Sequence, residues 1–514
     1  MTIELIKEAF KVEELKGSNE TQALVETEIY LNTSKDNIEK IIWVQGKPEI
    51  LNTKIIKDKL IVNGLVKFDL VYKSLEEENN IYTIEASKDF KEEIEIEGIT
   101  EEMSVNIKPM LEYIEEEMEE NKVILKALVN LWGEVEEIKT LEVIKDIRGK
   151  DDLQTLKEKV NYKEIYGRET SYALLKETFK VSEDKPNIEK ILKTSVNVKE
   201  IESMVVEDRV IVSGEATATV IYAGENKISS LKETIPFNHF LDTEGAHRES
   251  KGKVNFEVVE GIYEVVENEI GESKLLDMEI KIRISGMVYD EKSRDLIIDA
   301  YSTRDNLLIE REEVNIRENI TDIIHNETLN LDISNVDARE IFDIEGKVNI
   351  VDKKYVNGDI VVDGILSLEI IYLDRLSEEV NIFKEDFPYN AGIEVEEVGS
   401  GILIDLDAKL DGIKYSFRKD NLQVEANVCH DLSISKNKTL YGIKEIKETG
   451  DPIDKKNKPS ITIYIVQKDD ILWDIAKRYN TTIEEILSSN GLSSSYELTP
   501  GDKIIIEKKV DMDF

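Results

Sequence analysis

The chain has 514 residues, which predicts three to four domains of roughly 150 residues each. Its 67 lysines and arginines stand against 109 aspartates and glutamates, and the formal charge of −42 opposes binding to nucleic acid and to an anionic membrane surface. Apolar residues make up 40% of the sequence, which indicates a folded acidic protein rather than a disordered acidic tail.

Cysteine use and hydropathy exclude several further classes. The single cysteine, Cys429, rules out an intramolecular disulfide and any multi-cysteine metal site. The first residues show no apolar core ending in small residues, as a secretory signal would, and no window has the ~20 apolar residues of a membrane span. We therefore expect a cytoplasmic protein without a metal ion, a cofactor or membrane insertion.

One block recurs at a spacing of 150 residues. The first two copies share the sequence NIEKI at 37–41 and 187–191, and 338–341 is a degraded third. Glycines and tyrosines keep the same step in all three copies: Gly64, Gly214 and Gly364, and Tyr72, Tyr222 and Tyr372.

Between each glycine and tyrosine the residues alternate as in a half-buried strand. One face is apolar in every copy: Val66, Phe68, Leu70 and Tyr72, then Ala216, Ala218, Val220 and Tyr222, then Leu366, Leu368, Ile370 and Tyr372. The other face carries residues such as Lys67 and Thr217, which predicts a sheet with one solvent-exposed side. Upstream, Asn357-Gly358 favours a type I′ turn, and we align Asp58-Lys59 and Asp208-Arg209 with it. Each unit is thus predicted to start with a long β-hairpin.

Later alternating segments predict further strands at 123–134, 278–289 and 422–432. Connecting segments at 153–161, 174–181 and 307–315 favour partly helical or extended structure. The fold class is therefore multidomain and mainly β, with three tandem units that we place at 1–150, 151–310 and 311–448. A polar run with two prolines at 449–460 is typical of a linker.

Residues 461–509 change to a strand, helix, helix, strand pattern, which indicates a small α+β module. After an alternating strand at 461–467, Asp470 is the expected N-cap of a helix whose apolar stripe is Leu472, Ile475, Ala476 and Tyr479. Thr482 and Glu485 have the spacing of a capping box, Asn490-Gly491 ends the second helix, and the last strand follows at 503–507.

The segment from Tyr464 through Thr482, with Asn490 and the run at 498–506, resembles a LysM domain. Members of that family are βααβ modules that usually bind N-acetylglucosamine polymers between the loop after the first strand and the loop after the second helix. Here those loops are 468–472 and 489–492. Where the family has Gly-Asp-Thr or Gly-Asp-Ser before the leucine, this chain has Asp469-Asp470-Ile471, which adds a Cβ and a charge and removes a hydroxyl.

These departures disfavour sugar binding, and the apolar and basic residues nearby favour binding to a protein surface with apolar and acidic groups. We expect Trp473 to belong to the core of the module. The predicted partner- or glycan-binding residues lie in the LysM loops and first helix: Lys468, Asp469, Asp470, Ile471, Leu472, Lys477, Arg478, Asn490, Gly491 and Leu492.

The repeats, with their Gly-to-Tyr spacing and later aromatic stretches at 235–237 and 387–389, are similar to the SPOCS domain, also called DUF3794. Three such repeats before one LysM domain resemble the SipL family, the SpoIVA-interacting proteins of sporulating clostridia. The resemblance implies a non-enzymatic spore-coat adaptor in the mother cell, at the forespore surface. Its LysM domain would bind the SpoIVA-like ATPase that polymerises into the basement layer of the coat.

Two other functions remain open from the sequence. One is a LysM-mediated peptidoglycan-binding protein, and the other is a hydrolase with an unrecognised β-rich catalytic domain. Acidic runs such as 115–117 are typical of solvated faces, and the four histidines (His239, His247, His325 and His430) form no HExxH motif. No glycine-rich phosphate loop is present, so ATP chemistry would belong to a partner.

Overall fold

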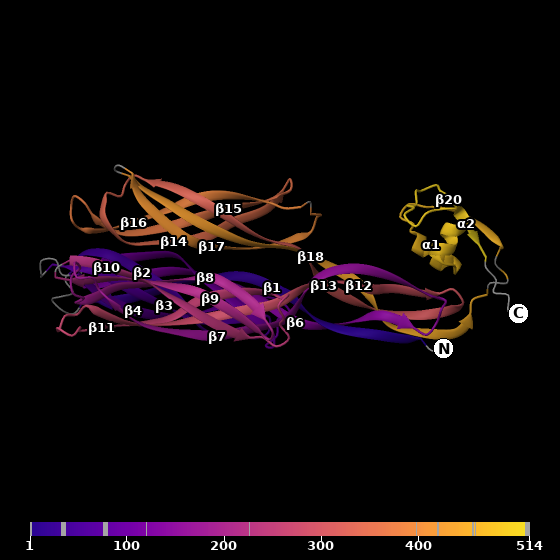
Figure 1. Cartoon of the computed structure of the whole chain (residues 1–514), viewed down its shortest axis with the longest axis horizontal. Coiled ribbons are helices and arrows are strands. Elements are labelled where there is room, and N and C mark those ends of the chain that lie inside the picture. The colour runs from indigo at the N-terminus through magenta and orange to yellow at the C-terminus, as the bar shows by residue number, and fades with distance from the viewer. Residues whose placement is uncertain are drawn as a thin grey trace.

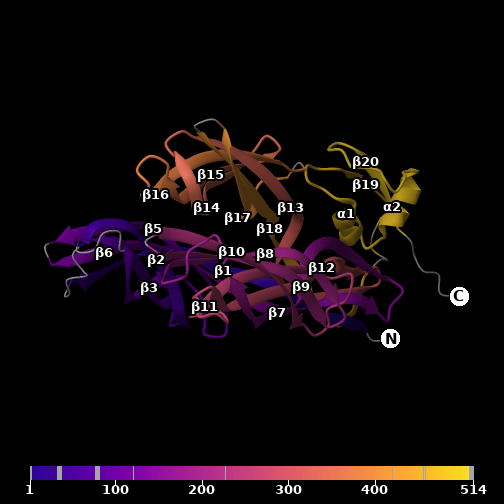
Figure 2. The same ribbon diagram turned by 60° about the vertical axis from the view of Figure 1, so that its left-hand side comes forward.

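In the computed structural model three β-rich units pack side by side and a small α+β module lies at one end, near the N-terminus (Figure 1, Figure 2). This confirms the predicted fold class. The structure describes residues 3–31, 38–75, 81–119, 121–225, 227–396, 398–418, 421–454, 457 and 459–508.

Each unit is a pair of long antiparallel strands with four strands inserted between them in sequence. The second strand of the insert is the centre of a three-stranded meander, and its last strand joins the long pair to form a second sheet. In the first unit the strands are β1 (Glu4–Tyr30), β2 (Ile38–Ile55), β3 (Lys59–Ser74), β4 (Ile81–Glu95), β5 (Ser104–Glu119) and β6 (Lys122–Arg148), in the sheets β2-β3-β4 and β1-β6-β5.

The other two units repeat this order. The second unit comprises β7 (Leu153–Lys180), β8 (Lys190–Val206), β9 (Arg209–Gly224), β10 (Lys227–Asp242), β11 (Lys251–Val266) and β12 (Leu275–Ser302). The third comprises β13 (Asp305–Ile333), β14 (Ala338–Val356), β15 (Asp359–Asp374), β16 (Val380–Glu394), β17 (Ile402–Arg418) and β18 (Asn421–Pro452). Within the parts of these units that the structure describes, no helix is present.

Several sequence expectations are corrected here. The connecting segments, for which the sequence left partly helical and extended structure open, are extended: they belong to the long strands β7 and β13, and each of these strands pairs along its length with a distant strand. Each unit therefore starts with a long strand, and the predicted hairpin follows it. The boundary placed between 310 and 311 falls inside β13, and the first residues of the predicted linker belong to β18. Part of that linker and residue 37 lie outside the described residues.

The hairpin turns confirm the predicted turn in the third unit and shift it in the others. Asn357 and Gly358 have φ angles of 52° and 100°, as a type I′ turn requires. In the first unit the positive φ angles belong to Lys57 and Asp58, at 37° and 61°, so the turn begins one residue earlier than predicted. In the second, Asp208 has φ 56° and is the second turn residue, which is the same shift.

The two sheets of each unit pack face to face into a sandwich, here called the head of the unit. The apolar face predicted for the central strand of the meander is buried in all three heads. In the first head it consists of Val66, Phe68, Leu70 and Tyr72, and the eight counterparts of these residues in the other two heads are buried as well. The recurring glycine lies opposite an aromatic residue of the next strand, as in Gly64 with Phe90, Gly214 with Phe237 and Gly364 with Tyr389. The ring covers the glycine, which explains why both recur.

Beyond the heads the long strands continue as a stalk. Where the head meets the stalk, one residue of each long pair bulges out of the ladder, at Lys16, Tyr166 and Ile320, and bulges of this kind bend a strand. The stalk is defined as the strand residues on the far side of these bulges: 4–15, 136–148, 153–165, 289–302, 305–319 and 435–452. Residues from all three units share its core, among them Phe10, Tyr162 and Ile316.

The heads meet at a second shared cluster, made of two residues from each unit: Trp43 and Val71, Leu192 and Ile221, and Phe342 and Ile371. Val71, Ile221 and Ile371 lie on the meander face that the sequence predicted to be solvent-exposed. That prediction holds for Lys67, which is exposed, and fails nearer the cluster because the three heads cover this face together.

A buried charge network lies where the second and third heads meet. Lys193 has a side chain only 2% exposed, and its Nζ lies 3.2 Å from Asp343, 3.1 Å from Glu345 and 3.6 Å from Glu369. Burial raises the pKa of Glu345, and the Lys193 charge opposes that rise. The repeat spacing aligns Trp43, Lys193 and Asp343, so the same position of the repeat is aromatic in the first unit, basic in the second and acidic in the third.

We predict that Gly64→Val destabilises the first unit, because a Cβ there would lie 2.6 Å from the Glu49 carbonyl oxygen and against the Phe90 ring. The expected cost is about 1 to 3 kcal/mol, measured as a lower urea midpoint of the full chain. Gly392→Ala is the control, since a Cβ at Gly392 meets no heavy atom within 4 Å. Equal midpoints for the two variants would contradict the packing role of Gly64.

Lys193→Met should destabilise the chain by about 3 to 5 kcal/mol at pH 8, because it leaves the buried Asp343 and the partly buried Glu345 and Glu369 without a counter-charge. A carboxyl whose folded pKa is raised weakens the fold above that pKa, so the deficit should shrink as the pH falls to 5. Urea unfolding at the two pH values measures this. Lys199→Met, on the same strand and half exposed, is the control. A deficit independent of pH would argue against unpaired carboxylates as the cause.

Candidate partner-binding site in the carboxyl-terminal module

The module has the predicted strand, helix, helix, strand order: β19 (Ile461–Ile465), α1 (Leu472–Tyr479), α2 (Ile483–Asn490) and β20 (Lys503–Glu507). β19 and β20 pair antiparallel as a two-stranded sheet. Among the described residues, neither helix is long and apolar enough to span a membrane. Trp473 is 5% exposed and packs with Ile475, Ile486 and Ile504, which confirms its predicted place in the core.

The loop before α1 differs from the prediction in one respect. Ile471, not Asp470, is the N-cap residue, and it makes no side-chain cap. Asp470 instead accepts hydrogen bonds from the Gln467 N–H and the Tyr464 hydroxyl, both at 2.7 Å. These bonds hold the pKa of Asp470 below its ordinary value, the tyrosine bond most strongly. Its carboxylate is therefore committed to closing the loop.

The loop before β20 uses the same device. Asp502 accepts from the Tyr496 hydroxyl at 2.6 Å and from the Thr499 N–H at 2.9 Å, and these bonds lower its pKa. In both loops the aspartate closes on residues three and six positions earlier. Two carboxylates thus fix the two loops that border the module's sheet.

α2 begins and ends as predicted. Thr482 and Glu485 form a reciprocal capping box, and Gly491 closes the helix with φ 65°. The Asn490 side chain donates to the carbonyls of Ile486 and Ile505, at 2.8 and 2.7 Å, and accepts from the Ile505 N–H at 2.7 Å. Its amide is therefore occupied in tying α2 to β20. Leu472 and Leu492, also in the predicted set, pack against the module's core.

One side of α1 faces the stalk of the second unit. Asp299 of β12 accepts from the Trp473 indole N–H at 2.9 Å and from Lys477 Nζ at 2.6 and 2.8 Å. Tyr301 donates to the Thr481 carbonyl at 2.8 Å, and its ring meets the Trp473 ring edge-on at 4.9 Å. Burial pushes the pKa of Asp299 upward, but the bonds from Lys477 and Trp473 outweigh it and the pKa lies below its ordinary value.

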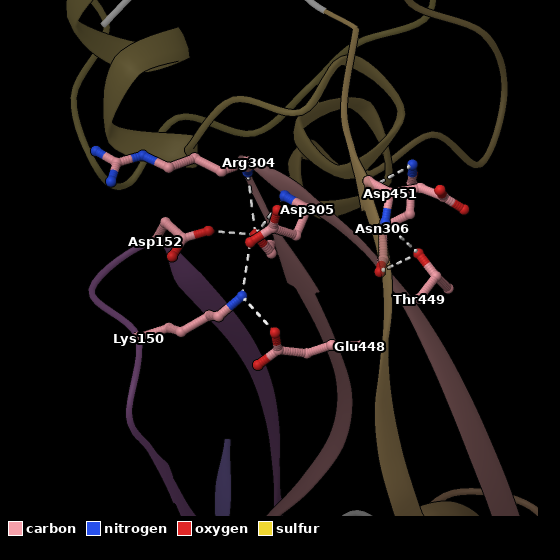
Figure 3. Close-up of polar contacts among 9 residues, drawn as sticks. Lys150, Asp152, Arg304, Asp305, Asn306, Glu448, Thr449 and Asp451 are labelled. Carbon is pink, nitrogen blue, oxygen red and sulfur yellow. Dashed lines mark hydrogen bonds and ion pairs between the residues drawn. The ribbon is translucent and has the colours of Figure 1, made fainter. Parts of the chain in front are cut away.

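A polar network ties the end of the stalk together beside this contact (Figure 3). Lys150, from the turn between the first two units, lies 2.6 Å from Asp305 and 3.0 Å from Glu448. Asn306 donates to the Asp451 carbonyl at 3.1 Å, and the Ile453 N–H donates to the Arg304 carbonyl at 2.8 Å. The chain therefore leaves β18 from a fixed point next to the place where the module rests.

The opposite side of the module presents an apolar face to solvent. Because β19 alternates, Ile461, Ile463 and Ile465 point outward and are 60%, 64% and 53% exposed. Ile505 of β20, the register partner of Ile463, is 37% exposed on the same face. These four side chains are called the isoleucine face below.

The predicted binding residues are thus divided between two sides. Lys468, Asp469 and Ile471 are exposed, and exposed Arg478 donates to the Tyr464 hydroxyl at 3.1 Å, whereas Lys477 is bonded to the second unit. Asp469 has φ 67°, the left-handed conformation that suits the glycine found in LysM domains. Sequence reasoning missed Asp299 and Tyr301, since no pattern connects residues 174 to 180 positions apart. The sequence showed the alternation of β19, but it did not show which of the two faces of this strand is exposed to solvent.

Comparison with family models assigns both parts of the chain. A model described as the SipL, SPOCS domain matches residues 37–119, 187–266 and 337–418, and a LysM domain model matches 464–507. The chain contains three SPOCS domains of the SipL type and one LysM domain. The three SPOCS matches coincide with the inserts β2–β5, β8–β11 and β14–β17, between the long strands. Both are binding domains, which fits a sporulation-related adaptor or a LysM binding protein. No curated protein and no solved structure matches the chain.

The LysM domain should lose stability in acid. The pKa values of Asp470 and Asp502 are lowered, so their contribution is present above the unfolded-state pKa of about 3.9 and is lost as the pH falls through the lower folded-state values. Far-UV circular dichroism at 222 nm, from pH 6 to pH 2, measures the loss of the two helices. Asp470→Asn with Asp502→Asn should show a smaller acid loss, and an unchanged acid profile would contradict this assignment.

Proposed function

We propose that this chain is a non-enzymatic adaptor of spore-coat assembly that acts in the mother cell at the forespore surface. Its LysM domain binds a SpoIVA-like ATPase, which polymerises into the basement layer of the coat, and so localises the ATPase around the forespore. The isoleucine face carries this proposal. It is an exposed apolar surface on a small domain whose core is already filled by other side chains.

The residues around the isoleucine face support a protein partner. Lys503, the register partner of Ile465, and Glu507, the register partner of Ile461, are exposed at the two ends of this face. An apolar centre with one charged residue of each sign at its ends suits a partner surface that presents apolar groups and complementary charges. Isoleucine side chains offer no hydrogen bond to a sugar hydroxyl, so this face has little to offer a glycan.

The loops that hold sugar in other LysM domains support the same conclusion. Asp470 and Asn490 have polar atoms that are engaged within the domain, and Ile471 has no hydroxyl. Asp469 keeps the backbone shape of a glycine but adds a carboxylate. Peptidoglycan binding through this groove is therefore the less supported alternative.

The three SPOCS units supply the rest of the adaptor. Their long strands form one stalk with a shared core, and the LysM domain rests at its end, away from the heads (Figure 1). We propose that the units are an elongated scaffold that sets the LysM domain apart from the heads. The heads are then free to contact other coat proteins.

Ile463→Glu combined with Ile505→Glu should weaken binding of the purified SpoIVA-like ATPase to the full chain by about 10-fold or more, because it places two charges in a desolvated contact. Biolayer interferometry measures the affinity. Ile262→Glu is the matched control, since Ile262 is 52% exposed on the second SPOCS unit.

The same titration with soluble peptidoglycan fragments separates the two functions. The proposal predicts ATPase binding that the fragments do not inhibit. Binding to the fragments alone would contradict it. So would ATPase binding that the combined Ile463→Glu and Ile505→Glu variant leaves intact.

A further inference from the structure

The end of β12 forms a contact with the LysM domain, through Asp299 and Tyr301. In each long strand pair of the stalk one residue bulges out, at Lys145, Ile298 and Lys444, and an acidic residue follows at once: Asp146, Asp299 and Glu445. Bulges re-aim the side chains that follow them. The three acidic residues therefore occupy equivalent places.

The residue two positions later distinguishes the second unit. In the first unit Arg148 bonds Asp146 at 3.2 Å, and in the third Lys447 bonds Glu445 at 2.8 Å. The second unit has Tyr301 in that place, so Asp299 lacks a basic partner two residues along its own strand. Lys477 of the LysM domain supplies the missing charge, together with Arg311 of β13.

The contact has the composition of a binding hot spot on a small scale. A tryptophan, a tyrosine and a lysine meet one carboxylate, and such aromatic and charged residues dominate the energy of protein interfaces. Asp299 is only 13% exposed there and Tyr301 only 5%. Beyond these residues, Leu156 is the other stalk side chain packed against the LysM core in the part of the chain that the structure describes. Small polar contacts between domains of one chain open readily.

We propose that the second SPOCS unit masks an interaction surface on the LysM domain, formed by Trp473, Lys477 and the Thr481 carbonyl. This surface takes an extended partner segment that carries a carboxylate two residues before a tyrosine, as Asp299-Ala300-Tyr301 does. Residues two apart on a strand point the same way, so such a segment presents both groups together. The partner gains access only when the LysM domain leaves the stalk.

Tyr301→Arg tests the mask, because it gives the second unit the Asp-x-Arg arrangement of the first. Arginine should pair with Asp299 on its own strand and release the LysM domain. Hydrogen exchange read by mass spectrometry should rise about threefold or more in the segments 295–305 and 472–482. Lys477→Glu should open the same contact from the other side. Asp295→Asn, an exposed residue of the same strand, is the control and should leave exchange unchanged.

A labelled peptide of residues 295–305 tests the surface itself. Fluorescence anisotropy should show that it binds the full-length Tyr301→Arg chain, not the wild type, and that adding Lys477→Glu abolishes binding. Unchanged exchange in both opened variants would overturn the mask, and an opened chain that ignores the peptide would overturn the surface. The ATPase takes no part in this experiment, so its result is independent of the proposed function.

Discussion

The antiparallel pairing of the six long strands is the constraint on which the rest of the structure depends. Strands of 27 to 32 residues pair with partners that lie 89 to 149 positions away in the sequence, and each pair encloses one SPOCS insert. Their far halves pack into one stalk with a shared apolar core, which brings the three inserts together at the other end. The position of the LysM domain follows as well, because the chain leaves β18 at the stalk end and is anchored there by the polar network of Figure 3.

Three similar units in one chain also allow differences that a repeat of identical copies would forbid. At one repeat position the chain has Trp43, Lys193 and Asp343, and the last two meet in a buried ion pair. Such a pair costs desolvation energy and is best understood as a device that specifies which heads adjoin. The acidic residue after the stalk bulge varies in the same way. In the first and third units a basic residue two positions later on the same strand pairs with it, whereas in the second unit Arg311 of β13 and Lys477 of the LysM domain do so.

Local patterns in the sequence were enough to predict the features that depend on residues close together in the chain. Alternation identified the meander strands, Asn357-Gly358 predicted its turn, and the capping box of α2 appeared as expected. Patterns were less decisive elsewhere. The sequence left the segment 153–161 between partly helical and extended structure, and it is a strand because β12 pairs with it. Asp470 does not cap α1, because Tyr464 and Gln467 engage its carboxylate. Lys477 seemed free for a partner, and only the fold brings Asp299 beside it.

The LysM domain therefore has two unlike sides, one held by the second SPOCS unit and one open to a partner. Lysine-directed cross-linking of the full chain mixed with a purified SpoIVA-like ATPase, the proposed partner, tests this account most directly when the products are read by mass spectrometry. Lys503 lies on the open side, in register with Ile465, and the account predicts that it becomes linked to the ATPase. Cross-links to the ATPase from the SPOCS units alone, with none from the LysM domain, would contradict it.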